Sequence, residues 1–288
     1  MGGQRRAAEA KLLEERMAEC TDAFKERTRR ACETGAWLTV LPVTANGTDL
    51  SADEFRDSLC LRYGITPRHL PATCDGCGDR FTVGHAMTCR RGGLVRMRHG
   101  TMSDEWHRLC ASALIPSAVT DEPVIQPGRC AQGSGPNAPP AIPELRGDIA
   151  ARSFWKANTT AIFDVRVTDT DAPSNRGRPA HKTLQVQERE KKAKYLSACL
   201  ERRMSFTPLV FSVDGQMGQE AAAATKRLAS LLAGKWRRHY SDTCGFVRSR
   251  IAISLARTVS MCLRGSRNPS AHVSRPHMES GAGLRLYQ

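Results

Sequence analysis

The sequence predicts a mixed α+β fold, in which a small metal-binding region precedes a sheet that is flanked by helices. Runs of apolar and β-branched residues at 161–167 and 207–213 are typical of buried strands. Long segments with helical spacing follow them at 184–203 and 218–238, as expected for helices that cover a sheet. A cysteine and histidine cluster at 74–89 has the spacing of a metal site.

The charge of the chain indicates the kind of partner that it binds. Its 288 residues, enough for one large domain or two small ones, carry 43 Lys and Arg against 29 Asp and Glu, a net charge of +14. This excess favours a polyanion, most often nucleic acid. No apolar run reaches the ~18 residues of a membrane span, and the N-terminus lacks a signal segment. We therefore expect a nuclear or cytoplasmic protein, neither secreted nor in contact with a membrane, whose 11 cysteines are reduced.

The elements before the cysteine cluster are predicted from periodicity and caps. Residues 4–33 have helical spacing and are predicted to form one helix within an N-terminal segment, 1–35. The run Trp37–Val43 is predicted to be a short strand or an extended segment. Ser51, with a glutamate three residues later, is typical of a capping box that begins a helix.

Four residues in the connector and zinc-knuckle region, 36–118, have the spacing of a zinc site. Cys74 and Cys77 form a Cys-x-x-Cys pair on a glycine turn, and His85 and Cys89 lie one helical turn apart. These four ligands would close a tetrahedral site with no open position, so we expect the zinc to be structural. The alternative is a set of unrelated reduced cysteines and a histidine.

A basic segment follows the cluster directly. Arg96, Arg98 and His99 lie ahead of a helix and are candidates for phosphate contacts. The same residues would also suit a solvated helix face, and the sequence does not separate the two interpretations.

Prolines and glycines mark the predicted domain boundary. The segment 119–142 is rich in proline and contains Gly-Ser-Gly, which predicts a linker without regular structure. A second domain is predicted over 143–263, and the tail 264–288 is predicted to be disordered.

Two aspartates and a lysine cluster in the second domain are the candidate catalytic residues. Asp164 lies within an apolar strand, where a carboxylate is costly unless it is paired or bound to a metal ion. Asp148 lies beside a second short run, so the two acids could share a magnesium ion. Lys191, Lys192 and Lys194 follow on a predicted helix, from which one could stabilise the charge of a phosphate. Alternatively, these are surface turn acids and a solvated helix face.

The last predicted helix, 246–262, adds basic residues to the rim of the sheet. Arg248 and Arg250 lie off its apolar face and are candidate nucleic-acid contacts.

The order of these motifs resembles the C-terminal region of non-LTR retrotransposon reverse-transcriptase proteins. CDGCG, GHAMTC and GGLVRMRH are similar to the cysteine–histidine knuckle of that family. RGDIAARSFW, FDVRVTD, EREKKAKY and FTPLVFSVDG are similar to its restriction-like endonuclease, a member of the PD-(D/E)XK superfamily. The resemblance covers roughly residues 37–260. It implies a magnesium-dependent DNA endonuclease with a structural zinc knuckle.

The resemblance assigns roles residue by residue, with three departures. Asp148 and Asp164 match the metal-binding acids, and Lys191, then Lys192, matches the lysine that this family carries on a helix. Gly147 stands where a proline is expected, and Arg166 stands where the wider superfamily has its lysine. The polymerase motif F/Y-x-D-D does not occur, so we expect no reverse transcription by this chain.

Three functions are consistent with the sequence. The first is a nuclease that nicks DNA through two aspartates and a lysine. The second is an inactive or truncated remnant that still binds DNA or RNA. The third is an interaction protein whose zinc site only stabilises a small fold.

Overall fold

The computed structural model describes residues 8, 11–12, 14–15, 17–128, 143–175 and 177–268. Its fold is mixed α+β, as the sequence predicts, with a four-stranded sheet in the order β1–β4–β5–β6. These strands are β1 (Val119–Asp121), β4 (Ile149–Arg152), β5 (Thr160–Thr168) and β6 (Ser205–Ser212). Neighbours are antiparallel except β5 and β6, which run parallel and are joined by helix α6 (Ala180–Glu201).

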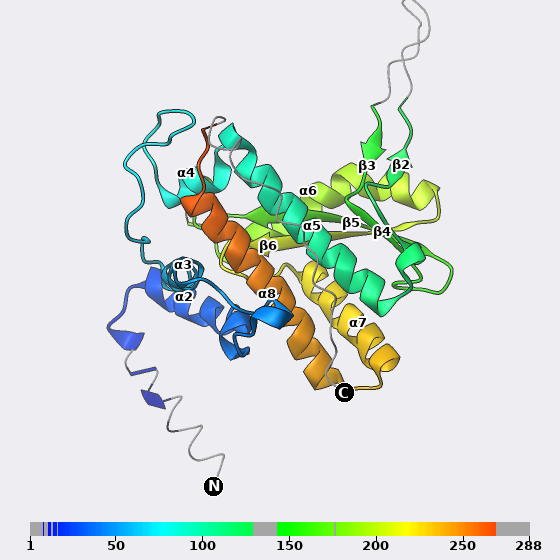
Figure 1. The fold of residues 1–288 in the computed structure, drawn as a ribbon, viewed down its shortest axis with the longest axis horizontal. Coiled ribbons are helices and arrows are strands. Elements are labelled where there is room, and N and C mark those ends of the chain that lie inside the picture. Colours follow the sequence, from blue (N-terminus) through cyan, green and yellow to red (C-terminus); the bar gives the residue numbers. More distant parts are fainter. Residues whose placement is uncertain are drawn as a thin grey trace, which may run out of the picture.

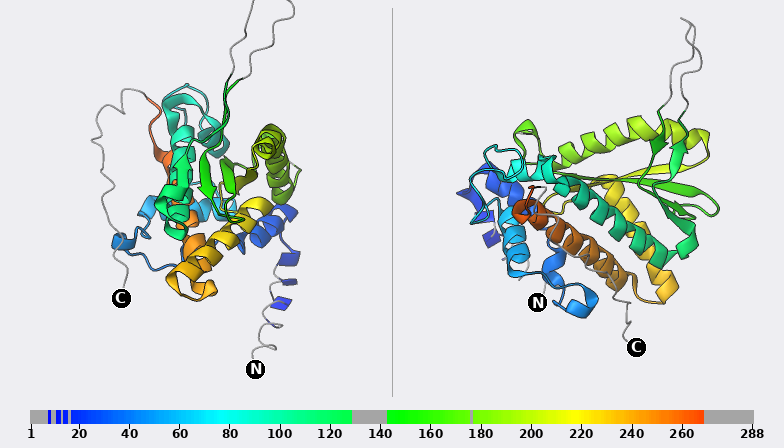
Figure 2. Two further views of the ribbon diagram at one scale, coloured as in Figure 1. Left: turned by 90° about the vertical axis from the view of Figure 1, so that its right-hand side faces the viewer. Right: turned by 45° about the horizontal axis from the view of Figure 1, so that its top comes forward.

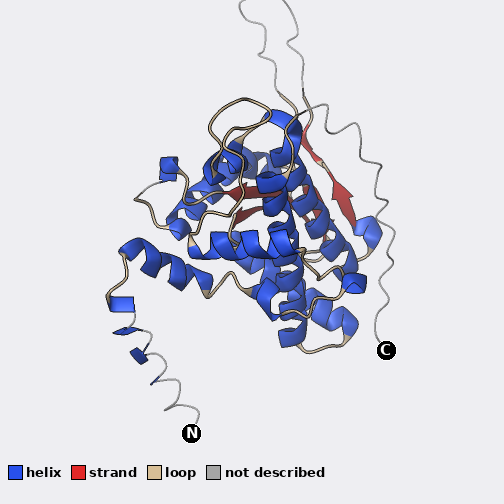
Figure 3. Cartoon of the chain, turned by 60° about the vertical axis from the view of Figure 1, so that its left-hand side comes forward, coloured by secondary structure: helices blue, strands red, loops and turns tan. Residues whose placement is uncertain are grey.

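Helices cover both faces of this sheet. Helix α6 lies on one face, and α5 (Leu94–Ala113), α7 (Gln219–Trp236) and α8 (Tyr240–Arg264) lie on the other (Figure 1; Figure 2, right). The alternation along β5 explains the two layers, because Phe163 and Val165 join the core under α5, α7 and α8, whereas Ile162 joins the core under α6. Figure 3 shows the strands enclosed by helices.

The smaller elements extend one end of the molecule. Helix α3 (Ala52–Tyr63) packs against α8, and α2 (Asp22–Ala31) packs against α3 (Figure 1). The short helix α4 (Val83–Thr88) also contacts α8, and β2 (Val124–Gln126) pairs with β3 (Leu145–Arg146). The remaining elements are single 3₁₀ turns at Ala36–Thr39, Thr44–Asn46, Arg91–Gly93, Pro116–Ala118 and Pro173–Asn175.

One prediction about the N-terminal third is wrong, and another holds only in part. The predicted single helix over 4–33 is interrupted, because the Thr21 hydroxyl accepts a hydrogen bond from Phe24 N and begins a new helix there. No strand forms over Trp37–Val43, because Ala36–Thr39 is a 3₁₀ turn that packs against α8, whereas Val40 and Val43 beyond it have the extended backbone of the other alternative. The capping box at Ser51 is confirmed, because Ser51 and Glu54 exchange both hydrogen bonds.

The segment between the two predicted domains is more ordered than its prolines suggest. Strands β1 and β2 lie within 119–126, so the prediction of no regular structure is wrong there, and the call on 129–142 lies outside the described residues. Pro123 falls in the turn between these strands, where proline is tolerated. One core includes Leu61 and Trp106 from before this segment and Phe163 and Leu228 from after it.

The start of the predicted disordered tail is packed against the fold. Arg264 ends α8 and its guanidinium pairs with Asp57, whose side chain is 1% exposed. Arg267 is also 1% exposed. The prediction of disorder is therefore wrong for 264–268, and the rest of the tail lies outside the described residues. No helix in the described part of the chain is long and apolar enough to cross a membrane.

Gly147 fills a position with no room for a side chain. Its N–H donates to the carbonyl of Pro123 over 3.1 Å, and an added Cβ would lie 2.5 Å from Ile162 Cγ2. A proline at this position would lose the hydrogen bond and clash with β5. The packing therefore explains why glycine stands at this position.

We predict that Gly147→Ala lowers the free energy of unfolding by about 1–3 kcal/mol, because the extra methyl group overpacks against β5. Urea unfolding followed by circular dichroism measures this loss. The control is Gly100→Ala within α5, where the new methyl group meets no atom within 4 Å. The control is expected to stabilise by about 0.5–1 kcal/mol. Equal stabilities for both variants would contradict the account.

Candidate functional site: a metal-binding knuckle and an acidic pocket

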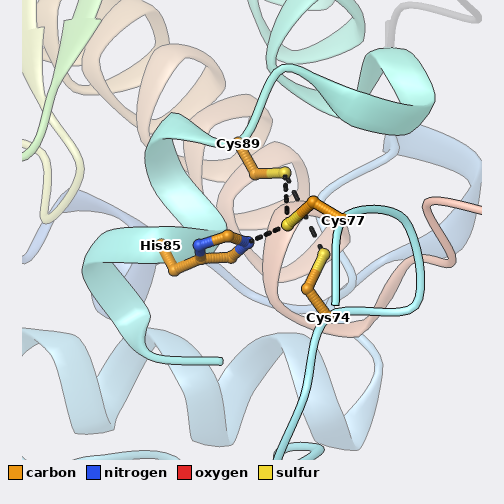
Figure 4. Close-up of side chains that lie close together, drawn as sticks. All are labelled: Cys74, Cys77, His85 and Cys89. Atoms are coloured by element: carbon orange, nitrogen blue, oxygen red, sulfur yellow. Dashed lines mark hydrogen bonds between the residues drawn. The ribbon is translucent and has the colours of Figure 1, made fainter. Parts of the chain in front are cut away.

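The predicted cysteine and histidine ligands come together in the structure. Their ligand atoms all lie within 4.8 Å of one another, and the side chains of Cys74, Cys77, His85 and Cys89 point at one centre (Figure 4). Cys77 Sγ lies 3.4 Å from His85 Nε2, and Cys89 Sγ lies 4.0 Å from the sulfurs of both other cysteines. A tetrahedral zinc with Zn–S bonds of ~2.3 Å separates its sulfurs by ~3.8 Å. This Cys₃His group could therefore hold a metal ion such as zinc.

Local structure explains how a 16-residue segment presents four ligands; we call Cys74–Cys89 the knuckle. The Cys-x-x-Cys turn closes through Gly78 N, which donates to the carbonyl of Cys74, and Gly78 has the left-handed φ of 79° that this turn requires. The Thr82 hydroxyl caps α4 by accepting from His85 N, and Cys89 ends the helix. The helix thus sets His85 and Cys89 one turn apart, as the spacing predicts.

Hydrogen bonding to Cys74 favours the thiolate that a metal ion needs. Burial raises the pKa of this thiol, but hydrogen bonds from the backbone of Gly76, from His85 and from Cys77 outweigh it, so the pKa falls to about 6. A thiolate accepts more hydrogen bonds than a thiol, and each of them stabilises the charged form.

The knuckle is fastened to the end of α8. The Asp75 carboxylate, between the first two cysteines, accepts from Ser266 Oγ and from the backbone N–H groups of Arg267 and Asn268. The Arg267 guanidinium lies over the Phe81 ring, 5.1 Å from its centroid, and donates to the carbonyls of Ala86 and Cys262. These contacts join the knuckle to the helical layer, so it is part of the fold.

We predict that purified protein carries about one equivalent of a bound metal ion, and that Cys77→Ser removes it, because three ligands hold a structural ion much less tightly than four. Elemental analysis and a thermal melt with and without chelator measure this. The control is Cys32→Ser, which changes an exposed thiol outside the knuckle. A melting temperature unaffected by chelator would contradict the prediction.

The two predicted acids lie close together at the end of β4. Ile149 pairs with Phe163 in the antiparallel β4–β5 ladder, and Asp148, just before the strand, donates its N–H to Phe163 O over 3.0 Å. Asp164 follows Phe163 on β5, and the charge of Asp148 acts on its carboxylate. Asp148 Oδ2 accepts a hydrogen bond from Val165 N over 2.6 Å. Because β4 begins at Ile149, it pairs with β5 only up to Phe163. Residues 164–168 of β5 extend beyond β4, and helices α5 and α6 approach the two acids there.

Helix α6 brings a lysine and a tyrosine to Asp164. The Lys191 ammonium forms an ion pair with Asp164 Oδ2, and the Tyr195 hydroxyl hydrogen-bonds the same carboxylate. Burial and then the charge of Asp148 raise the pKa of Asp164, which Lys191 and Tyr195 partly offset. Burial, followed by the charge of Asp164, raises the pKa of Tyr195. The site thus combines two nearby carboxylates, one of them buried, with one adjacent ammonium.

Helix α5 closes the site from the other side. His99 Nε2 lies 3.1 Å from Asp148 Oδ2. This hydrogen bond raises the pKa of His99 more than burial lowers it. A partly open cavity of about 250 Å³ lies beside these contacts, and neither aspartate is among its lining residues, which are Val95, Arg98, His99, Val165, Arg166, Val167 and Lys191. We call this cavity and the residues Asp148, Asp164, Lys191 and His99 the acidic pocket.

Other predicted site residues lie elsewhere. Lys192 points away and pairs with Glu220, so the structure brings Lys191 to the acids and not Lys192. The Lys194 ammonium donates to the Tyr195 hydroxyl over 2.8 Å. Arg166, at the lysine position of the superfamily, pairs with Glu190 on α6.

The candidate phosphate-binding arginines divide into surface and buried groups. Arg96 and Arg248 are exposed, as the prediction requires. Arg98 is 4% exposed and donates to the carbonyls of Met87 and Val167. Arg250 makes a bidentate ion pair with Glu105, itself 3% exposed. Phosphate contact does not fit these last two, because their guanidinium groups hold the fold together.

Sequence reasoning missed two contacts of the pocket. These are the contact of Tyr195 with Asp164 and that of His99, predicted to contact phosphate, with Asp148. The pairing of His99 with Asp148 spans 49 residues, and no local spacing indicates it. No family model matches the chain, and no curated protein matches its sequence.

Proposed function

We propose that the chain is a divalent-metal-dependent nuclease that cuts DNA at the acidic pocket. The observation that supports this most is the proximity of Asp148, Asp164 and Lys191, three residues selected from the sequence, of which Lys191 also lines an open cavity. The resemblance to the restriction-like endonuclease of non-LTR retrotransposon proteins points to the same chemistry. The net charge of +14 suits a polyanionic substrate.

The donor set fits a hard divalent cation. The Lys191 ammonium pairs with the Asp164 carboxylate, and burial, followed by the charge of the nearby Asp148, raises the pKa of Asp164. Carboxylate oxygens are the ligands that magnesium prefers, and its bound water and polarised phosphate oxygen supply the chemistry of phosphodiester hydrolysis. Asp148 and Asp164 would hold the ion. Lys191, released from its ion pair, would stabilise charge on the phosphate.

The proposed role of the knuckle is to stabilise the fold. Three cysteine sulfurs and one imidazole favour zinc over magnesium, and four protein ligands leave no position for a substrate. We propose a structural zinc there, because the knuckle holds the C-terminal end of α8 through Asp75 and Arg267.

A second candidate function is nucleic-acid binding without cleavage, as in an inactive remnant. The exposed Arg96 and the other basic residues would serve it equally well. The ion pair between Lys191 and Asp164 favours this alternative, since it offsets the charge of Asp164 without a metal ion. The activity of Asp164 and lysine variants separates the two functions.

We predict that Asp164→Asn abolishes magnesium-dependent nicking of plasmid DNA and leaves DNA binding intact or stronger, because a negative charge facing phosphate is gone. Lys191→Ala is expected to lower the nicking rate by about 10²–10³-fold. Gel analysis of plasmid relaxation measures both. Lys192→Ala is the matched control, one residue away and paired with Glu220, and should retain activity. Wild-type-rate nicking by the Asp164 variant would identify a contaminant, and an inactive wild type would favour the binding function.

We also predict that DNA binding depends steeply on salt, with a slope of log affinity against log salt of about −0.9 for each phosphate neutralised. Arg96→Ala should reduce the magnitude of the slope by about 0.9, because Arg96 lies on α5 one turn from His99 at the pocket. Fluorescence anisotropy at several salt concentrations measures it. The control is Arg56→Ala, an exposed arginine on α3. A wild-type slope near zero would exclude recognition of the DNA backbone.

A further inference from the structure

The Asp148 carboxylate is held in one orientation by two hydrogen bonds to the same oxygen. Val165 N donates to Oδ2 over 2.6 Å, and His99 Nε2 lies 3.1 Å from that oxygen. An ionised carboxylate only accepts hydrogen bonds, so His99 carries its hydrogen on Nε2 when it bonds to Asp148. Oδ1 makes no hydrogen bond within the described part of the chain, and it is the oxygen left for another ligand.

The backbone of Asp148 is fixed independently of these bonds. Its N–H donates to Phe163 O over 3.0 Å, and its carbonyl accepts from Glu122 N over 2.8 Å. The freedom that remains is rotation of the side chain. Val165 N belongs to β5 and cannot be removed by substitution, whereas the His99 side chain comes from a different element, α5, and is 43% exposed. Of the two groups that bond to Asp148 Oδ2, only the His99 side chain can therefore be replaced by substitution.

We propose that His99 is a positioning residue, which orients the Asp148 carboxylate so that Oδ1 and Asp164 together bind the divalent cation. The proposal rests on the proposed function. Outer hydrogen-bond partners of this kind fix the orientation of a metal ligand, and their loss costs about 10–100-fold in metal affinity. A histidine that only packs would have no such effect.

The test is a titration of the zinc-loaded protein with Mn²⁺, followed by electron paramagnetic resonance. His99→Leu is expected to weaken the manganese site about 10–100-fold. His99→Gln should stay within about threefold of wild type, because its amide N–H reaches a position similar to that of Nε2. Circular dichroism melts verify folding. If His99→Leu proves unstable, His99→Ser, which is small and polar, replaces it.

A second histidine on the same helix supplies the matched control. His107 Nδ1 hydrogen-bonds to Asp121 on β1, in a pair of the same chemistry. Asp121 pairs with Ile149, next to Asp148, but neither His107 nor Asp121 makes a side-chain hydrogen bond to Asp148 or Asp164 in the described part of the chain. His107→Leu should bind manganese as tightly as wild type. Equal weakening by His107→Leu and His99→Leu would show a general effect of altering α5 and would overturn the proposal.

The remaining outcomes separate this proposal from the proposed function. If Asp148→Asn abolishes manganese binding but His99→Leu leaves it unchanged, His99 has no positioning role while the metal site stands. If wild type has no manganese site that Asp148→Asn removes, both ideas fail. Nitrogen coupling from a histidine in the electron spin echo spectrum would make His99 a direct ligand and overturn the positioning role. Equal weakening by Leu and Gln would exclude the hydrogen bond as the cause.

Discussion

Burial of the Asp164 carboxylate near a second carboxylate is the constraint around which the sheet and its helices are arranged. An unpaired buried charge costs several kcal/mol, and a nearby like charge adds to it. The fold offsets this cost from three sides, with Lys191 and Tyr195 from α6, and with Val165 N and His99 on Asp148. A region that served only stability would be expected to fill this position with an apolar residue, as it does at Ile162.

The acidic pocket depends on α5, and α5 is tied to the knuckle. Arg98, next to His99, donates to the carbonyl of Met87 on α4, the helix that carries His85, and to Val167 on β5. The same guanidinium therefore bridges the metal-binding segment and the strand that bears Asp164. Arg267 and Asp75 fasten the other side of the knuckle to α8. The knuckle is thus joined through Arg98 to the first turns of α5, from which His99 reaches Asp148.

Local chemistry explains which parts of this arrangement the sequence predicts. The knuckle and the capping box at Ser51 depend on residues within one or two turns, and their spacing indicates them directly. Strands β5 and β6 are recognisable because nearly all their central residues are apolar or β-branched. The sequence did not predict strands β1 and β2, because the many prolines and glycines of 119–142 indicate a linker and each strand has only three residues. Pairing with β4 and β3, which lie further along the chain, is what orders them.

The sequence alone did not predict the contacts that depend on tertiary structure. The proximity of Asp148 and Asp164 depends on the register of β4 on β5, which pairs Ile149 with Phe163 and which no local spacing indicates. An arginine that contacts phosphate and one that forms a buried ion pair, such as Arg250 with Glu105, look alike in a basic segment. The choice between Lys191 and Lys192 depends on which side of α6 faces the sheet, which the structure resolves through Asp164 and Glu220.

The central claim is that Asp148 and Asp164 together hold a divalent cation. Anomalous diffraction from crystals soaked in manganese tests it most directly, because the ion's position is read without reference to activity. The account predicts a peak about 2.2 Å from an oxygen of each carboxylate, with the Lys191 ammonium displaced from its ion pair. Density that shows Lys191 still on Asp164, with manganese bound only elsewhere, would contradict it.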